Sequence, residues 1–134
     1  MIQSTGQTKD STYQAGVRKT FAISLQEAWQ LVFSGKGMAI WLGYDTDLRT
    51  VKGSPYKTGN AITGTVRVVK EFSHVRFTYK KENWDNESLV QIRFIAAKTG
   101  TTISFHQEKL ADSSQRKEMK QHWEAALTQF SALV

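Results

Sequence analysis

The sequence closes with residues 115–134, QRKEMKQHWEAALTQFSALV, and this stretch decides the fold. Its apolar side chains recur at intervals of three and four residues, which places them on one face of a helix. They are Met119, Trp123, Ala126, Leu127, Phe130, Leu133 and Val134. A face with a Trp, a Phe and a Met is too apolar to be left in water, so we expect the helix to cover another layer. Whether that layer is solid or encloses a cavity bears on function.

The composition predicts one globular domain. The chain has 134 residues, of which 40% are hydrophobic and 11% aromatic, and this is enough for a sizeable core. The absence of cysteine excludes disulfides, thiolate metal sites and cysteine catalysis, and it favours a cytoplasmic location. Residues 1–14 are polar and lack periodicity, so we expect a flexible leader there and a single domain over residues 15–134. No segment approaches the length of a membrane span.

The rest of the chain predicts one strand, two short helices and a run of antiparallel strands. Apolar and polar residues alternate from Ala15 to Ile23, which is typical of a half-buried strand. Ser24 and Glu27 then form a capping box that begins a helix, Ser34 to Gly37 ends it, and GMAIWLG adds a second helical piece. Further strands are expected over residues 61–72, 75–82, 88–98 and 101–110, after a loop over residues 44–60 with one short edge strand.

The alternation also predicts which side chains face the terminal helix. Ile62, Val66 and Val68 share one side of their strand, and Gln107 joins Ile103 on the inner side of the last strand. A sheet with one apolar face requires a cover, and the terminal helix is the only element long enough. Because a twisted sheet curls, a straight helix contacts its centre better than its ends, so we expect a pocket beneath the helix. The fold class is therefore α+β, with a curved antiparallel sheet around a long C-terminal helix.

Four stretches of this sequence match the pattern of a known family. They are GVRKTFAISLQEAWQLVFSGKGMAIWLG, VRFTY, GTTISFHQEKL and QHWEAALTQFSAL. The order of elements resembles the helix-grip, START-like (SRPBCC) superfamily, and within it residues 15–134 are similar to bacterial homologues of the activator of heat-shock-protein-90 ATPase. Tyr79 stands where that family often has Trp, and Leu25 where it often has Pro. The resemblance implies a cavity for an apolar or amphipathic molecule, in a family of binders, a few cyclases and chaperone regulators.

We expect a non-catalytic site for a small hydrophobic or amphipathic ligand, such as a lipid, between the sheet and the helix. Its walls are expected from Phe77, Tyr79, Ile92, Phe94, Phe105, Met119, Trp123 and Leu127, with Trp41 near the mouth and Gln107 as a polar anchor. A core position is an equal alternative for Trp41, Tyr79 and Trp123, since a buried indole N–H or phenol O–H needs a partner of any kind. For Gln107, a partner inside the core is the favoured alternative.

A protein partner is the second hypothesis. The resemblance, more than the residues, implies an interaction module that regulates a chaperone ATPase or a stress response. A partner of that kind would contact the outward face of the sheet, which carries Arg67, Arg76 and Arg93. Glu71 and Glu82 interrupt this face and no aromatic series accompanies it, so nucleic acid is not expected. We expect a monomer or a weak dimer.

Enzymatic activity is the least favoured hypothesis. The sequence has no nucleophile elbow, no phosphate-binding loop and no dinucleotide fingerprint, although a pocket with a tyrosine and an acid is able to transfer protons. The three histidines, His74, His106 and His122, lack the short spacing of metal ligands on one element. We therefore expect no metal, no other cofactor and, on balance, no catalysis.

Overall fold

A six-stranded antiparallel sheet lies against three helices in the computed structural model, which describes residues 12–134. The strands are β1 (Tyr13–Phe21), β2 (Pro55–Lys57), β3 (Thr63–Lys70), β4 (His74–Tyr79), β5 (Ser88–Ala97) and β6 (Gly100–Leu110). The helices are α1 (Leu25–Phe33), α2 (Gly35–Trp41) and α3 (Ser113–Phe130), and a 3-10 turn, η1 (Ser131–Leu133), follows α3. This architecture confirms the predicted α+β, helix-grip fold.

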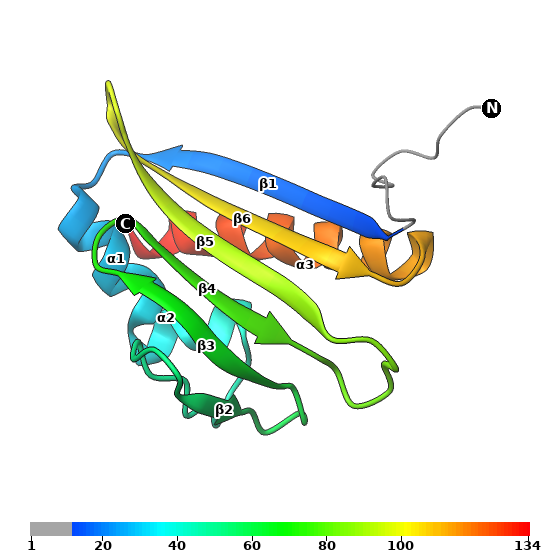
Figure 1. Ribbon diagram of the computed structural model, residues 1–134. Helices are drawn as coiled ribbons and strands as arrows, with labels where there is room; N and C mark the ends of the chain where they lie inside the picture. The colour runs from blue at the N-terminus through cyan, green and yellow to red at the C-terminus, as the bar shows by residue number, and fades with distance from the viewer. Residues whose placement is uncertain (1–11) are drawn as a thin grey trace.

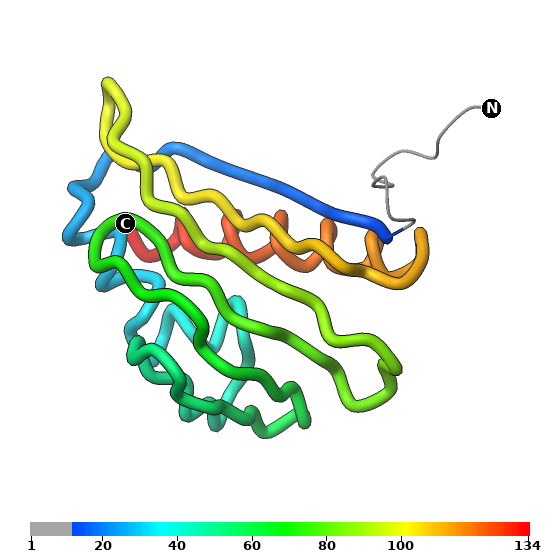
Figure 2. Tube along the Cα trace, in the orientation of Figure 1, coloured from blue at the N-terminus to red at the C-terminus, as the bar shows by residue number. Residues whose placement is uncertain are grey.

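The strand order is β1-β6-β5-β4-β3-β2, so the first strand pairs with the last. Figure 1 looks onto the face of the sheet that the helices leave uncovered, with α3 behind β5 and β6. The chain trace shows that β5 and β6 form one long hairpin across the middle of the sheet (Figure 2). Within residues 12–134, no helix is both long and apolar enough to cross a bilayer.

The first strand starts slightly earlier than the sequence indicates. β1 begins at Tyr13, two residues before the expected start of the domain at Ala15. Tyr13 lies opposite Leu110 of β6, and the register shifts between Tyr13 and Ala15, so a bulge interrupts the alternation where the prediction begins. Residues 1–11 lie outside the described part of the chain, and the leader expected there stays a prediction.

Two serines set the ends of the short helices. The predicted capping box is present, since Ser24 Oγ accepts from the Glu27 amide at 3.1 Å and Glu27 Oε1 accepts from the Ser24 amide at 3.0 Å. Ser34 closes α1 and also caps α2, because its Oγ accepts from the Gly37 amide at 3.0 Å. The second helix therefore begins at Gly35, two residues before its expected start at Gly37.

A bulge in β3 changes which side chains face inward. Val66 lies opposite Phe77, but Val68 lies opposite Arg76, so the strand has gained one residue between these pairs. Val68 is consequently 36% exposed on the outer face, and the prediction that it faces inward is wrong. Val69, opposite the buried Val75, packs against the core in its place.

The apolar face of α3 packs against the sheet as predicted over most of its length. Met119, Trp123, Ala126, Leu127 and Phe130 are all buried. The prediction is wrong for Leu133 and Val134, because α3 ends at Phe130 and the 3-10 turn η1 follows it. The exposed fractions there are 44% for Leu133 and 58% for Val134.

Candidate functional site

The space between the sheet and α3 holds a layer of aromatic rings. Trp123 of α3 stacks on Phe105 of β6 with ring centroids 4.7 Å apart and planes 8° apart. The rings of Tyr79 and Trp41 lie 6.0 Å and 6.4 Å from Trp123. All ten residues predicted to form the ligand site are buried: Trp41, Phe77, Tyr79, Ile92, Phe94, Phe105, Gln107, Met119, Trp123 and Leu127. The rings of Trp41, Phe77, Tyr79, Phe105 and Trp123 form one connected set of contacts, whereas Phe94 packs on Trp29 and Phe33 instead.

A short hydrogen-bond chain occupies most polar groups of this layer. Trp123 Nε1 donates to Gln107 Oε1 at 2.9 Å, and Gln107 Nε2 donates to Ser88 Oγ at 2.9 Å. Ser88 Oγ in turn donates to the backbone oxygen of Tyr79 at 2.6 Å. A ligand anchored on Gln107 would have to break this chain. The sequence pattern missed Ser88, although a serine that starts a predicted strand opposite Tyr79 is a recognisable signal.

Trp41 and His122 join α2 to α3. Trp41 is fully buried rather than at a mouth, and its Nε1 donates to the backbone oxygen of Val32 at 2.8 Å. Its own backbone oxygen lies 2.6 Å from His122 Nε2. Because a carbonyl oxygen only accepts, Nε2 carries the proton. Burial lowers the pKa of His122, and the hydrogen bond to Trp41 opposes that shift only in part, so the ring is neutral at pH 7.

Tyr79 differs from these residues. Its hydroxyl group is buried and has no hydrogen-bond partner among residues 12–134. Burial raises the pKa of the Tyr79 hydroxyl, and the negative charge of Glu118 raises it further, so the group stays protonated and able to donate. A buried hydroxyl without a partner is costly, because it has lost its hydrogen bonds to water and gained none.

The segment that covers Tyr79 is the connection between β4 and β5. We call residues 81–87 the lid. Its Trp84 is 5% exposed and packs on Tyr79, with ring centroids 5.8 Å apart. Lys81 Nζ lies 2.6 Å from Glu118 Oε2 of α3 and 6.0 Å from the centroid of the Trp84 ring. The sequence predicts a polar loop over residues 83–87, and the single Trp within it is the signal that this loop packs on the core. The strand predicted over residues 75–82 is too long, since β4 ends at Tyr79.

One of the hollows in the described surface lies where the lid begins. That hollow has a volume of about 370 Å³ and is lined by Asn60, Ile62, Lys81, Glu82 and Asn83. A second, of about 340 Å³, lies on the outer face of the sheet and reaches Glu87 at the end of the lid, and a third, of about 320 Å³, lies over the paired strands β1 and β6. Of the ten predicted site residues only Phe105 lines any of the three.

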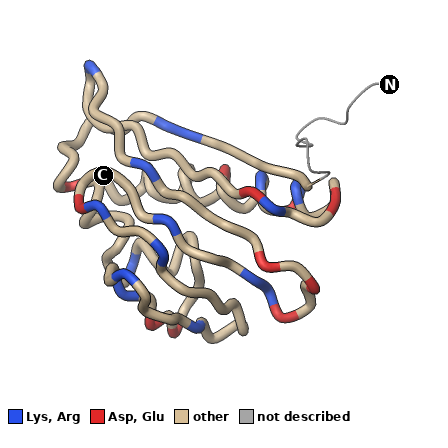
Figure 3. The backbone as a smooth tube through the Cα atoms, in the orientation of Figure 1, with Lys and Arg blue, Asp and Glu red and all other residues tan. Residues whose placement is uncertain are grey.

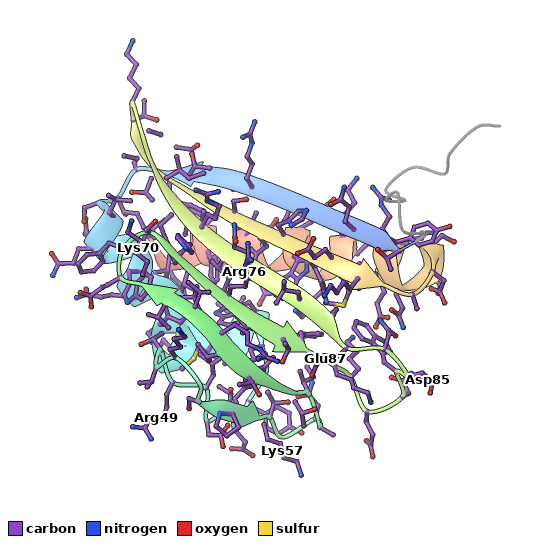
Figure 4. The ribbon with its side chains drawn as sticks, viewed as in Figure 1. Arg49, Lys57, Lys70, Arg76, Asp85 and Glu87 are labelled. Carbon is purple, nitrogen blue, oxygen red and sulfur yellow. The ribbon has the colours of Figure 1, made fainter. Side chains whose placement is uncertain are left out.

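The outer face of the sheet carries unpaired basic charge. Arg67, Arg76 and Arg93 are exposed there, and Arg76 donates to Gln91 Oε1 from Nε at 3.1 Å and from Nη2 at 2.8 Å. Within residues 12–134 the three arginines make no ion pair. Basic positions follow several strands on this side of the molecule, while acidic positions gather at the lid (Figure 3). Arg76 lies over the middle of this face, and Asp85 lies on the lid at its margin (Figure 4).

Solved structures share this fold at low sequence identity. Protein MLL2253 from Mesorhizobium loti superposes with a TM-score of 0.77 at 17% identity, covering 90% of this chain and 95% of that protein. PFC0360w from Plasmodium falciparum, described as an HSP90 activator, gives 0.76 at 11% identity, with 90% and 94% covered. The Aha1 dimer from Colwellia psychrerythraea gives 0.72 at 14% identity, with 87% and 91% covered. At these identities the likeness shows the fold alone.

The sequence itself carries the family assignment. No curated protein matches it. The family model described as activator of Hsp90 ATPase homolog 1-like protein matches residues 22–134, a span that starts just after β1 and contains α1, α2, strands β2 to β6 and α3. The aromatic layer beneath α3 thus lies wholly within the matched region, and the chain belongs to the activator of Hsp90 ATPase homolog 1-like family.

Proposed function

We propose that the chain binds a small hydrophobic or amphipathic molecule, without covalent chemistry, between the curved sheet and α3. The observation that carries this proposal is the Tyr79 hydroxyl. The other polar groups of the aromatic layer that the sequence predicts for a ligand, those of Trp41, Gln107 and Trp123, have partners within the protein. A molecule with apolar surface and one polar atom would supply the partner that Tyr79 lacks.

Native mass spectrometry tests this proposal on protein freshly purified from its own host. We expect an extra mass on the native protein that is lost on denaturation, and its value would give the size of the ligand. A protein that shows only its own mass, and that takes up nothing from a mixture of lipids and aromatic metabolites, would overturn the proposal. The function would then belong to the protein surface.

A second candidate is regulation of a chaperone ATPase in the cytoplasm. It is favoured by the family assignment, by the likeness to the Plasmodium falciparum HSP90 activator and by the uncovered basic face of the sheet. A negatively charged partner surface would complement Arg67, Arg76 and Arg93 there.

The test of this candidate measures the ATPase rate of the host's own Hsp90-type chaperone with and without the protein. We expect the triple variant Arg67→Glu, Arg76→Glu, Arg93→Glu to lose any stimulation. The matched control reverses three exposed lysines away from that face, at Lys36, Lys52 and Lys117, and so has the same net charge. Equal loss in both variants would show that overall charge, not this face, is responsible.

A further inference from the structure

Trp84 packs on the tyrosine that carries the unpartnered hydroxyl. Its ring packs on that of Tyr79, and it comes from the lid rather than from a strand or a helix. The ring of Tyr79 thus contacts the rings of both Trp84 and Trp123, with centroid separations of 5.8 Å and 6.0 Å. Two of these three rings belong to the sheet and to α3, and only Trp84 belongs to a segment without regular structure.

Side chains hold the lid against α3. Lys81 Nζ donates to Glu118 Oε2 at 2.6 Å, and the exposed fractions of these two side chains are 25% and 50%. Asn86 Nδ2 donates to Gln115 Oε1, and Gln115 Nε2 donates back to Asn86 Oδ1, each at 3.0 Å. Ion pairs in contact with water are weak, and side-chain bonds of this kind exchange readily for bonds to water.

The lid can leave α3 without breaking a strand ladder, but Asn86 Nδ2 also donates to the backbone oxygen of Lys109 in β6 at 3.1 Å and must release this bond as well. Its backbone hydrogen bond, from the Trp84 amide to the Lys81 oxygen at 3.0 Å, is internal and would move with it. The last ladder contact before the lid joins Lys80 to Thr63, and β5 begins after the lid at Ser88. The hollow of about 370 Å³ lies at the same edge and is lined by Lys81 and Glu82 of the lid, so open space already borders the segment that would move.

We propose that Trp84 is a displaceable plug, and that the ligand is an uncharged, planar ring compound that enters between the lid and α3 and accepts a hydrogen bond from the Tyr79 hydroxyl through an oxygen atom. This inference rests on the proposed function and specifies its ligand class and entrance. The ligand takes the place of the Trp84 ring and supplies the acceptor that an indole lacks.

The surroundings of Tyr79 select these properties. The ring of Tyr79, on which Trp84 packs in the free protein, favours a flat molecule, since aromatic pairs gain from stacked and edge-on contact. An ionised group would be costly in a buried layer whose polar side chains are already paired. A protonated phenol donates, so a carbonyl or ether oxygen is the complementary group.

Two matched probes test the proposal. 2-Acetylnaphthalene has a carbonyl acceptor, and 2-ethylnaphthalene has a methylene group in its place. Their dissociation constants are measured by equilibrium dialysis on four proteins: wild type, Tyr79→Phe, Trp84→Ala and the control Tyr56→Phe. Tyr56 is a suitable control because its ring is buried on the same side of the sheet, while its hydroxyl already donates to the backbone oxygen of Thr78.

On wild type and on Tyr56→Phe, we expect the acetyl probe to bind about tenfold more tightly than the ethyl probe. On Tyr79→Phe, we expect the two probes to bind with equal affinity. Trp84→Ala is expected to bind both probes about tenfold more tightly than wild type, because the plug is gone. If Trp84→Ala does not fold, Glu118→Gln replaces it, and the loss of the ion pair is expected to tighten both probes about twofold.

The remaining outcomes separate this proposal from the function it rests on. If both probes bind but the acetyl preference survives in Tyr79→Phe, the role of Tyr79 is overturned and an apolar site still stands. If neither probe binds any variant while native protein carries a bound mass, the ligand class is overturned and the proposed function stands. If the native protein carries no bound mass and neither probe binds, both the plug proposal and the proposed function are overturned.

Discussion

Tyr79 and Tyr56 present the same chemical group in two conditions. Both rings are buried, and burial raises the pKa of both hydroxyl groups, so both are protonated. Tyr56 donates to the backbone oxygen of Thr78 at 2.5 Å, whereas Tyr79 has no partner among residues 12–134. At the scale of a single residue, the difference between them is one satisfied hydrogen bond, and it is measurable as stability.

Removing these two hydroxyl groups is expected to change stability in opposite directions. In ligand-free protein, Tyr79→Phe removes a desolvated group without a partner and should raise the free energy of unfolding by about 1 kcal/mol. Tyr56→Phe breaks a buried hydrogen bond and should lower it by about 1–2 kcal/mol. Urea denaturation of both variants gives the two values. A loss of equal size in Tyr79→Phe would mean that its hydroxyl has a partner in the free protein.

His122 makes stability depend on pH below neutrality. Burial holds its folded-state pKa below the ordinary value of 6.5, so the unfolded chain binds the proton more readily. The contribution of His122 to the free energy of unfolding should therefore be fully present above about pH 6.5. It should decrease as the pH drops from there toward the folded-state pKa. His122→Gln, whose amide can still donate to Trp41, should flatten this slope in a urea titration from pH 7.5 to 5.

His74 supplies the comparison for that titration. Burial lowers its pKa too, and the charges of Arg93, Lys70 and Arg76 act in the same direction. Some pH dependence of the free energy of unfolding should remain in His122→Gln. It is expected to become weaker still when His74→Gln is added to that variant. An unchanged slope in His122→Gln would show that this ring does not resist protonation in the folded state.

At the scale of elements, α1 and α2 meet at a point with no room for a side chain. A Cβ atom at Gly37 would collide with the backbone oxygen of Leu31 in α1, whereas a Cβ at Gly35 would meet open space. Gly37→Ala should therefore lower the free energy of unfolding by about 1–3 kcal/mol, since the two helices must separate. Gly35→Ala is the matched control and should be neutral or slightly stabilising. Similar losses in thermal unfolding of both would contradict this packing.

The same scale shows where sequence patterns predict structure and where they do not. The capping box of Ser24 and Glu27 depends on neighbours three residues apart, and it was predicted correctly. The bulge at Val68 depends on pairing with β4, which no local alternation reveals, and the inward face was assigned wrongly from that point. Ser34 ends α1 and caps α2, so a pattern that is typical of the end of a helix also marks the beginning of the next one.

At the scale of the whole molecule, the fold was predictable because the sheet needs a cover and α3 is the element that supplies it. The contacts within the layer beneath α3 were not predictable from the sequence. Whether Trp123 and Gln107 bind a ligand or each other depends on pairing across strands, and the structure places them 2.9 Å apart. The unpaired hydroxyl of Tyr79 is visible only after every other partner has been placed, and so is the packing of Trp84 on the Tyr79 ring.

Hydrogen exchange should resolve this layer into a stable centre and a movable edge. β5 and β6 are long, central and covered by helices, so their inner amides should exchange only when the whole molecule unfolds. The amide of Trp84, bonded within the lid to Lys81, should exchange at least about a hundredfold faster, through local opening. Mass spectrometry of exchanged, digested protein compares the two segments. If the lid exchanges as slowly as β5, it does not open on its own, and a molecule could reach Tyr79 only by unfolding the domain.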